Sequence, residues 1–93
     1  MTEATAPQSF SVAALLAGDR TEFARLVDAT SGPIYRLALR MVDNPQDAED
    51  ILQETYLKVL KALPGFEGRS SLTTWLYRIA VNESLMLLRK RRP

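Results

Sequence analysis

The chain has 93 residues and a net charge of +1, and its 46% hydrophobic and 25% charged residues suit one small globular domain, not a disordered or fibrous protein. It has no Cys and no His, which excludes disulfides, thiol nucleophiles and the usual zinc ligands, and it offers no nucleophile, base and orienting group for an enzyme. Because no apolar run approaches the roughly 20 residues of a membrane helix and no signal-peptide pattern appears, we expect a cytoplasmic binding module without a cofactor.

The first nine residues, 1–9, show no periodic apolar pattern, and we expect them to form a flexible lead-in to a single domain at 10–92. A short helix is predicted over about Phe10–Leu16. Gly18 follows it, and glycine accepts the left-handed backbone that often ends a helix. No strand pattern and no internal repeat appears in the sequence. The expected fold class is therefore all-α, a compact bundle of about four helices.

A long second helix is predicted to begin at Asp19, where Glu22 three residues later completes the pattern of a capping box. Apolar residues at helical spacing continue to Met41 and keep their register across Pro33. Proline inside a helix removes one backbone hydrogen bond and bends the axis, so we expect one helix kinked at Pro33. Two helices joined at Gly32 are the alternative.

A third helix is predicted from the Asn44-Pro45 pair to about Leu63, because Asn caps helix starts and proline suits the first helical position. Its predicted core stripe consists of Ala48, Ile51, Leu52, Thr55, Val59, Ala62 and Leu63. The opposite face is polar and acidic, and it consists of Gln46, Glu49, Asp50, Gln53 and Glu54, with Asp47 at its margin.

Two leucines, Leu57 and Leu60, lie on this acidic face. Apolar anchors inside an acidic ring are typical of a protein interface, in which charges steer the encounter and a few buried side chains carry the energy. The alternative is that the leucines pack beneath the N-terminal helix. The carboxylates do not suit a metal site, since neighbouring helical positions point apart and no second cluster completes a coordination shell.

Pro64-Gly65 ends the third helix, and Ser70 or Ser71 is predicted to cap a last helix that reaches about Arg89 and precedes a basic tail. Projection at about 100° per residue separates its side chains into stripes. The expected core stripe consists of Leu72, Leu76, Ile79, Met86 and Leu87. A second apolar stripe is either covered by another element or exposed, and it consists of Tyr77, Val81 and Leu88.

The remaining side of this helix, with the loop before it, suits nucleic acid. It holds Thr74, Arg78, Asn82, Leu85 and Arg89, with Trp75 at its edge. Arginines bind phosphates, Asn82 offers a donor and an acceptor to a base edge, and Trp75 offers an aromatic face. The loop adds four further candidates beside a helix N-terminus, Phe66, Arg69, Ser70 and Ser71. The structural alternatives are a core position for Trp75, a cap or buried network for Asn82, and a solvated basic tail.

Acidic and basic residues are distributed unevenly along the chain. Residues 43–63 include five acidic and two basic residues, and residues 64–93 include two acidic and six basic ones. An acidic middle and a basic end indicate two partners of opposite character. Solvated faces that only keep the protein soluble are the alternative.

Two stretches together resemble a known family. Residues 47–56 read DAEDILQETY, and residues 66–82 contain FEGRSS followed by TWLYRIAVN. In this order and separation they resemble region two of bacterial sigma factors of the extracytoplasmic-function group, over about Leu15–Arg92. The resemblance implies that the acidic helix docks on the clamp helices of the largest subunit of core RNA polymerase. The polymerase-binding residues would be Asp47, Glu49, Asp50, Gln53, Glu54 and Leu57.

The resemblance also implies that the loop and the last helix capture a flipped non-template-strand base of the promoter minus-ten element. By this resemblance the DNA-binding residues would be Phe66, Gly68, Arg69, Ser70, Ser71 and Asn82, with Arg78 and Arg89 near the backbone, and the projected side of the last helix adds Thr74 and Trp75. Base flipping costs a few kcal/mol of unstacking, so the domain alone is expected to bind promoter DNA weakly.

The sequence departs from the family pattern in two respects. Housekeeping sigma factors melt DNA with neighbouring aromatic residues, whereas this helix has the single Trp75. Family members usually continue through a linker into a second helical domain that reads the minus-thirty-five element, and we expect this chain, which ends at Pro93, to be a fragment without that domain. The alternative function is a helical protein-interaction module for an anti-sigma factor, with a surface at Leu57, Leu60, Tyr77, Val81 and Leu88.

Overall fold

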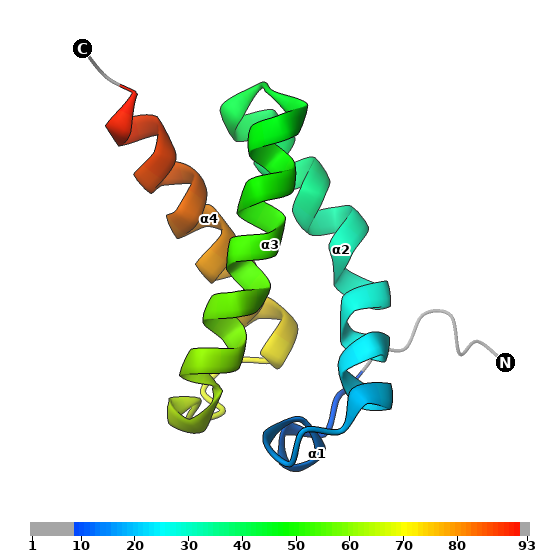
Figure 1. Ribbon diagram of the computed structural model, residues 1–93. Coiled ribbons are helices and arrows are strands. Elements are labelled where there is room, and N and C mark those ends of the chain that lie inside the picture. Colours follow the sequence, from blue (N-terminus) through cyan, green and yellow to red (C-terminus); the bar gives the residue numbers. More distant parts are fainter. Residues whose placement is uncertain (1–8, 92–93) are drawn as a thin grey trace, which may run out of the picture.

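Four α-helices account for most of residues 9–91, the part of the chain that the computed structural model describes (Figure 1). They are α1 (Val12–Leu16), α2 (Arg20–Val42), α3 (Pro45–Ala62) and α4 (Leu72–Lys90), and a short 3-10 turn, η2 (Leu63–Gly65), follows α3. No strand occurs between residues 9 and 91, and the all-α prediction is confirmed. None of the helices in this part of the chain is long and apolar enough to cross a membrane.

The three long helices form the body of the fold. Each of α2, α3 and α4 packs against the other two, and α1 packs against the start of α2 and against η2. In Figure 1, α3 runs through the middle of the bundle, with α2 on one side and α4 crossing behind it. The loop from η2 to α4 and the short helix α1 therefore lie at the same end of the bundle.

The start of the fold differs slightly from the prediction. The first helix begins at Val12 and not at Phe10, because the Ser11 hydroxyl caps it by accepting the Ala14 N–H at 3.0 Å. Asp19 caps α2 as predicted and accepts the Glu22 N–H at 3.0 Å. The Glu22 carboxylate does not complete a capping box, since it accepts the backbone N–H of Ser11 at 2.7 Å instead. The expected lead-in lies outside the described residues, except for Ser9.

α2 is a single helix that continues through Pro33, as predicted, and the alternative of two helices is wrong. Figure 1 shows its ribbon bending near the middle. One turn earlier, the Thr30 hydroxyl donates to the Leu26 carbonyl at 2.7 Å and accepts a hydrogen bond from the Tyr56 hydroxyl of α3. Burial raises the pKa of Tyr56 above its usual value of 10.0. This short chain of hydrogen bonds links α3 to the turn of α2 that precedes the bend.

Three polar side chains of the described chain are buried, Thr30, Thr55 and Ser84. Each hydroxyl donates to the backbone carbonyl four residues earlier in its own helix, at 2.7, 2.7 and 2.9 Å. A buried hydroxyl without a partner would cost about 1–3 kcal/mol, so these local bonds let polar residues occupy an otherwise apolar core.

The core stripe of α3 is largely as predicted. Asn44 caps the helix and Pro45 is its first residue. Five of the predicted positions are buried, one is half-buried and one, Ala62, is exposed. The reason is that Ala62 is the last residue before η2, whose tighter winding turns Leu63 inward, to 2% exposure, and leaves Ala62 outside.

The core stripe of α4 is rotated from the predicted one. Leu72 and Leu76 are buried as expected, but Met86 is 45% exposed, and Ala80 and Ser84 are completely buried. Small side chains let neighbouring helices approach closely, and a stripe chosen by hydrophobicity overlooks them. The rotation also turns the second apolar stripe toward the neighbouring helices. Its members are half-buried and not exposed, and they are Tyr77, Val81 and Leu88.

Candidate nucleic-acid interface

The loop between η2 and α4 has a definite shape. Gly68 has a φ of +74°, a left-handed conformation that strains residues with a side chain. At the end of the loop the Ser71 hydroxyl caps α4 by accepting the Thr74 N–H at 3.1 Å, and it also contacts the hydroxyl of Thr73 at 3.2 Å. Ser71 thus already has a structural role, and its role as a DNA ligand stays a prediction.

An aromatic pair fixes the loop to the helix. The rings of Phe66 and Trp75 lie with centroids 4.9 Å apart at an angle of 45°, and both side chains are half-buried. Aromatic pairs at this separation stabilise by about 0.5–1.5 kcal/mol beyond the area that they bury. Trp75 therefore forms a wall against which the loop packs, and only part of its ring remains accessible.

A hollow of about 190 Å³ opens between this loop and the first turns of α4. It is lined by Gly65, Phe66, Glu67, Gly68, Arg69, Ser70, Trp75 and Arg78. Six of the residues predicted from the sequence to bind DNA thus surround one space, while Ser71, Thr74, Asn82 and Arg89 lie outside it. Arg69 pairs with Glu67, with 3.0 Å between Nε and Oε1, whereas Arg78 forms no ion pair with any residue from 9 to 91.

The exposed side of α4 is the one that the projection predicted. Thr74, Arg78, Asn82, Leu85 and Arg89 are all exposed, and Trp75 is half-buried at their edge. The Asn82 side chain forms no hydrogen bond within the described chain, so the alternative of a buried network is wrong for this residue. From the hollow, this side extends along α4 past Asn82 to Arg89.

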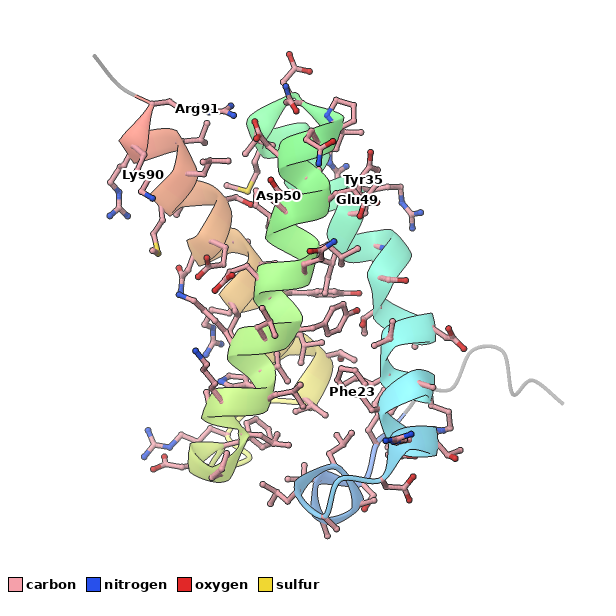
Figure 2. All side chains as sticks on the ribbon, in the orientation of Figure 1. Phe23, Tyr35, Glu49, Asp50, Lys90 and Arg91 are labelled. Atoms are coloured by element: carbon pink, nitrogen blue, oxygen red, sulfur yellow. The ribbon has the colours of Figure 1, made fainter. Side chains whose placement is uncertain are left out.

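The acidic face of α3 is also exposed as predicted, at Gln46, Glu49, Asp50, Gln53 and Glu54. Figure 2 shows Glu49 on the α2 side of α3. Leu57 and Leu60 are 54% and 48% exposed, so neither is covered by the N-terminal helix.

Asp47 differs from the other acidic residues of α3. Its side chain is only 18% exposed and forms an ion pair with Arg91, just after α4. In Figure 2 the Arg91 side chain reaches toward the N-terminal end of α3, whereas Lys90 points away. Asp47 therefore joins the start of α3 to the end of α4, and its contribution to a polymerase interface stays a prediction.

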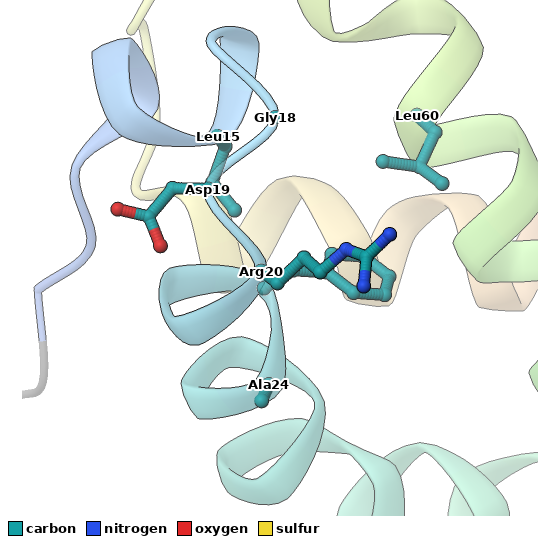
Figure 3. A pocket seen from close by; sticks show the side chains of 7 residues that line it. Leu15, Gly18, Asp19, Arg20, Ala24 and Leu60 are labelled. Carbon is teal, nitrogen blue, oxygen red and sulfur yellow. The ribbon is translucent and has the colours of Figure 1, made fainter.

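An apolar groove lies beside Leu60, at the end of the bundle that holds α1. It has a volume of about 260 Å³ and is lined by Leu15, Gly18, Asp19, Arg20, Phe23, Ala24 and Leu60. Figure 3 shows Leu60 facing across this space toward α1 and the start of α2.

Sequence reasoning missed one further contact between helices. Lys58 of α3 and Glu83 of α4 form an ion pair with 2.6 Å between Nζ and Oε2, and the Glu83 side chain is 11% exposed. The hydrogen bond to Glu83 raises the pKa of Lys58 above its usual value of 10.5. No spacing in the sequence identifies this pair, because the partners meet only when α3 and α4 pack together.

The sequence of the chain is similar to those of known proteins, and this similarity shows its family. The Sigma-70 region 2 family matches residues 26–93. The chain belongs to this family. The region 2 domain is 40% identical over 76 residues to the ECF RNA polymerase sigma factor SigW of Bacillus subtilis, a match that covers 82% of this chain and 41% of SigW. It is 55% identical over 56 residues to the ECF RNA polymerase sigma factor SigG of Mycobacterium tuberculosis, covering 58% of this chain and 15% of SigG.

A solved structure has the same fold. The region 2 domain superimposes with a TM-score of 0.76 on the NMR structure of an engineered region 2 of sigmaE in complex with GTAAAA. The two are 30% identical, and the match covers 98% of this chain and 94% of that one. The region 2 domain thus spans about two fifths of the length of SigW and nearly all of the engineered domain.

Proposed function

We propose that this chain acts in transcription initiation, by binding core RNA polymerase and by capturing a flipped base of the non-template strand of the promoter minus-ten element. The observation that carries the proposal is the hollow beside Trp75, which has an aromatic wall and two arginines. The engineered sigmaE domain that shares this fold was solved in complex with GTAAAA. A promoter-binding role would also place the chain in the cytoplasm, where the promoters are.

The hollow has the groups that an unstacked base and its phosphates require. The exposed parts of Phe66 and Trp75 offer aromatic surface for stacking, which contributes about 1–3 kcal/mol per base in single-strand complexes. Arg78 has no carboxylate partner in the described chain and can meet a phosphate. Further along the same side, the exposed amide of Asn82 offers both a donor and an acceptor to a base edge.

Binding of single strands tests the DNA contact. Arg78→Ala and Asn82→Ala should each weaken binding of a GTAAAA strand, measured by NMR titration of the chain. Arg40→Ala removes the same charge as Arg78→Ala from the last turn of α2, far from the hollow, and is the matched control. Base capture at this site is refuted when neither Arg78→Ala nor Asn82→Ala binds more weakly than the control while the fold remains intact.

The polymerase contact is proposed for the acidic face of α3, with Leu57 as its apolar anchor. Charged rims steer association and exposed leucines supply apolar area at the centre of an interface. Asp50→Arg and Gln53→Ala should reduce the amount of core polymerase retained in a pull-down, whereas Asp28→Arg on the exposed surface of α2 should not. Equal retention by all three variants would move the interface elsewhere.

A second candidate function is binding of an anti-sigma partner, and the groove beside Leu60 is the observation that favours it. An apolar groove next to a half-exposed leucine suits the apolar face of a partner helix. The other predicted part of this surface, Tyr77, Val81 and Leu88, is half-buried and offers less apolar area to a partner than Leu60 does. Leu60→Lys should raise activity from a responsive promoter in cells if such a partner represses the chain. Activity equal to that of the wild type would argue against this candidate.

A further inference from the structure

One acidic residue stands at the hollow, in the most basic part of the chain. Of the two acidic residues in 64–93, Glu83 is nearly covered by its pair with Lys58. The other, Glu67, has a side chain that is 67% exposed and lines the hollow. A carboxylate repels the phosphates of any strand that approaches this surface, so Glu67 opposes the binding for which the rest of the hollow is suited.

Glu67 is directed at one of the two arginines of the hollow. Its Oε1 lies 3.0 Å from Nε of Arg69. Gly68, the residue between them in the sequence, has a left-handed backbone conformation that turns the chain at this point. Arg78 lines the same hollow without an ion pair to any residue in 9–91. The loop thus presents one arginine that is already neutralised and one that is not.

We propose that Glu67 is an internal competitor for the phosphate site of Arg69, and that it weakens electrostatic, sequence-independent binding of single-stranded nucleic acid at the hollow. This inference rests on the proposed function of the hollow. A strand that uses Arg69 must first separate it from Glu67 and must then tolerate the nearby carboxylate. Since phosphate contacts contain no sequence information, Glu67 lowers the affinity for all strands by the same factor.

The size of the effect follows from the exposure of the pair. The side chains of Arg69 and Glu67 are 87% and 67% exposed, so solvent screens their attraction strongly. Exposed pairs of this kind are weak, and Glu67→Gln is therefore expected to tighten binding by only about two- to fivefold at low salt. If the released Arg69 neutralises one more phosphate, the slope of log affinity against log salt becomes steeper by up to about 0.7.

Two probes and four variants test the proposal. The variants are Glu67→Gln, Arg69→Gln, the double variant of these two, and Asp43→Asn. The probes are the hexanucleotides GTAAAA and oligo-dT, each titrated into the 93-residue chain at several salt concentrations. Glu67→Gln should tighten both by the same factor and steepen both salt slopes. In the Arg69→Gln background the same change should have a smaller effect, because the competition is gone. Asp43→Asn removes an equal charge just before the start of α3, whose length of about 27 Å separates that end from the loop, and should change neither slope.

The outcomes separate this inference from the proposed function. Unchanged or weaker binding of both strands by Glu67→Gln overturns the inference, as does a gain of equal size in the Arg69→Gln background. A loss confined to one strand overturns it too, because Glu67 would then read a base. If the wild type binds neither strand at any salt concentration, the proposed function fails and the inference with it.

Discussion

Replacing Phe66 by Ala tests whether the aromatic pair holds the loop. A fully buried Phe→Ala change costs about 3–5 kcal/mol, and Phe66 is half-buried, so we expect a loss of about 2 kcal/mol. The contact with Trp75, at 4.9 Å between centroids, supplies part of this loss. For a domain of this size the melting temperature should fall by roughly 8–16 °C.

The chain contains a single Trp, so tryptophan fluorescence reports on the surroundings of Trp75, which include this contact. Urea unfolding followed by Trp75 emission should show a lower midpoint for Phe66→Ala and a native spectrum shifted to longer wavelength. Met86→Ala removes a side chain of α4 that is 45% exposed, and it should stay within about 0.5 kcal/mol of the wild type. A wild-type midpoint and spectrum for Phe66→Ala would refute the view that the ring pair shapes the hollow.

Three further changes follow from the fold. Ser71→Ala removes the cap of α4 and should cost about 1 kcal/mol in urea unfolding, and a loss below about 0.3 kcal/mol would contradict the capping role. Ala80→Leu forces a large side chain into a completely buried position and should cost at least about 1–3 kcal/mol, also by urea unfolding; a stable variant would show that the helices can separate there. Stability should fall as the pH rises above about 10, because Tyr56 and Lys58 both have a raised pKa in the folded chain and bind their protons more tightly there than in the unfolded chain. Thermal melts between pH 8 and 11 should show a smaller fall for Tyr56→Phe than for the wild type, and an equal fall would exclude a contribution from Tyr56.

The starts of the three long helices, α2, α3 and α4, could be predicted from the sequence because their causes are local. Asp19, Asn44 and Ser71 each cap a helix by a hydrogen bond that spans three residues, and Pro45 occupies the first position of α3. The exposed side of α4 was predictable for a similar reason, since a fixed rotation per residue places Arg78 and its neighbours on one side.

Contacts that depend on packing could not be predicted in this way. The core position of Ala80 follows from how closely the long helices approach, not from its own hydrophobicity. The pairs of Asp47 with Arg91 and of Lys58 with Glu83 form only after α3 and α4 pack together. The loop is intermediate. Pro64-Gly65 indicated where the third helix ends and the loop begins, but the hollow also requires the Phe66 ring to lie on Trp75.

The buried hydroxyls have a consequence for how the bundle can open. Thr55 and Ser84 donate within their own helices, so parting α3 from α4 exposes them to water without breaking their hydrogen bonds. Among residues 9–91, the contact of the half-buried Tyr56 with Thr30 is the one hydrogen bond between hydroxyls of different helices. The other polar contacts between the long helices are two ion pairs, Lys58 with Glu83 and Asp47 with Arg91, and the remaining resistance to sliding comes from the sizes of side chains. A local separation of α4 would therefore cost apolar area and these two ion pairs but no hydrogen bond of a buried hydroxyl, and hydrogen exchange at its amides would measure that cost directly.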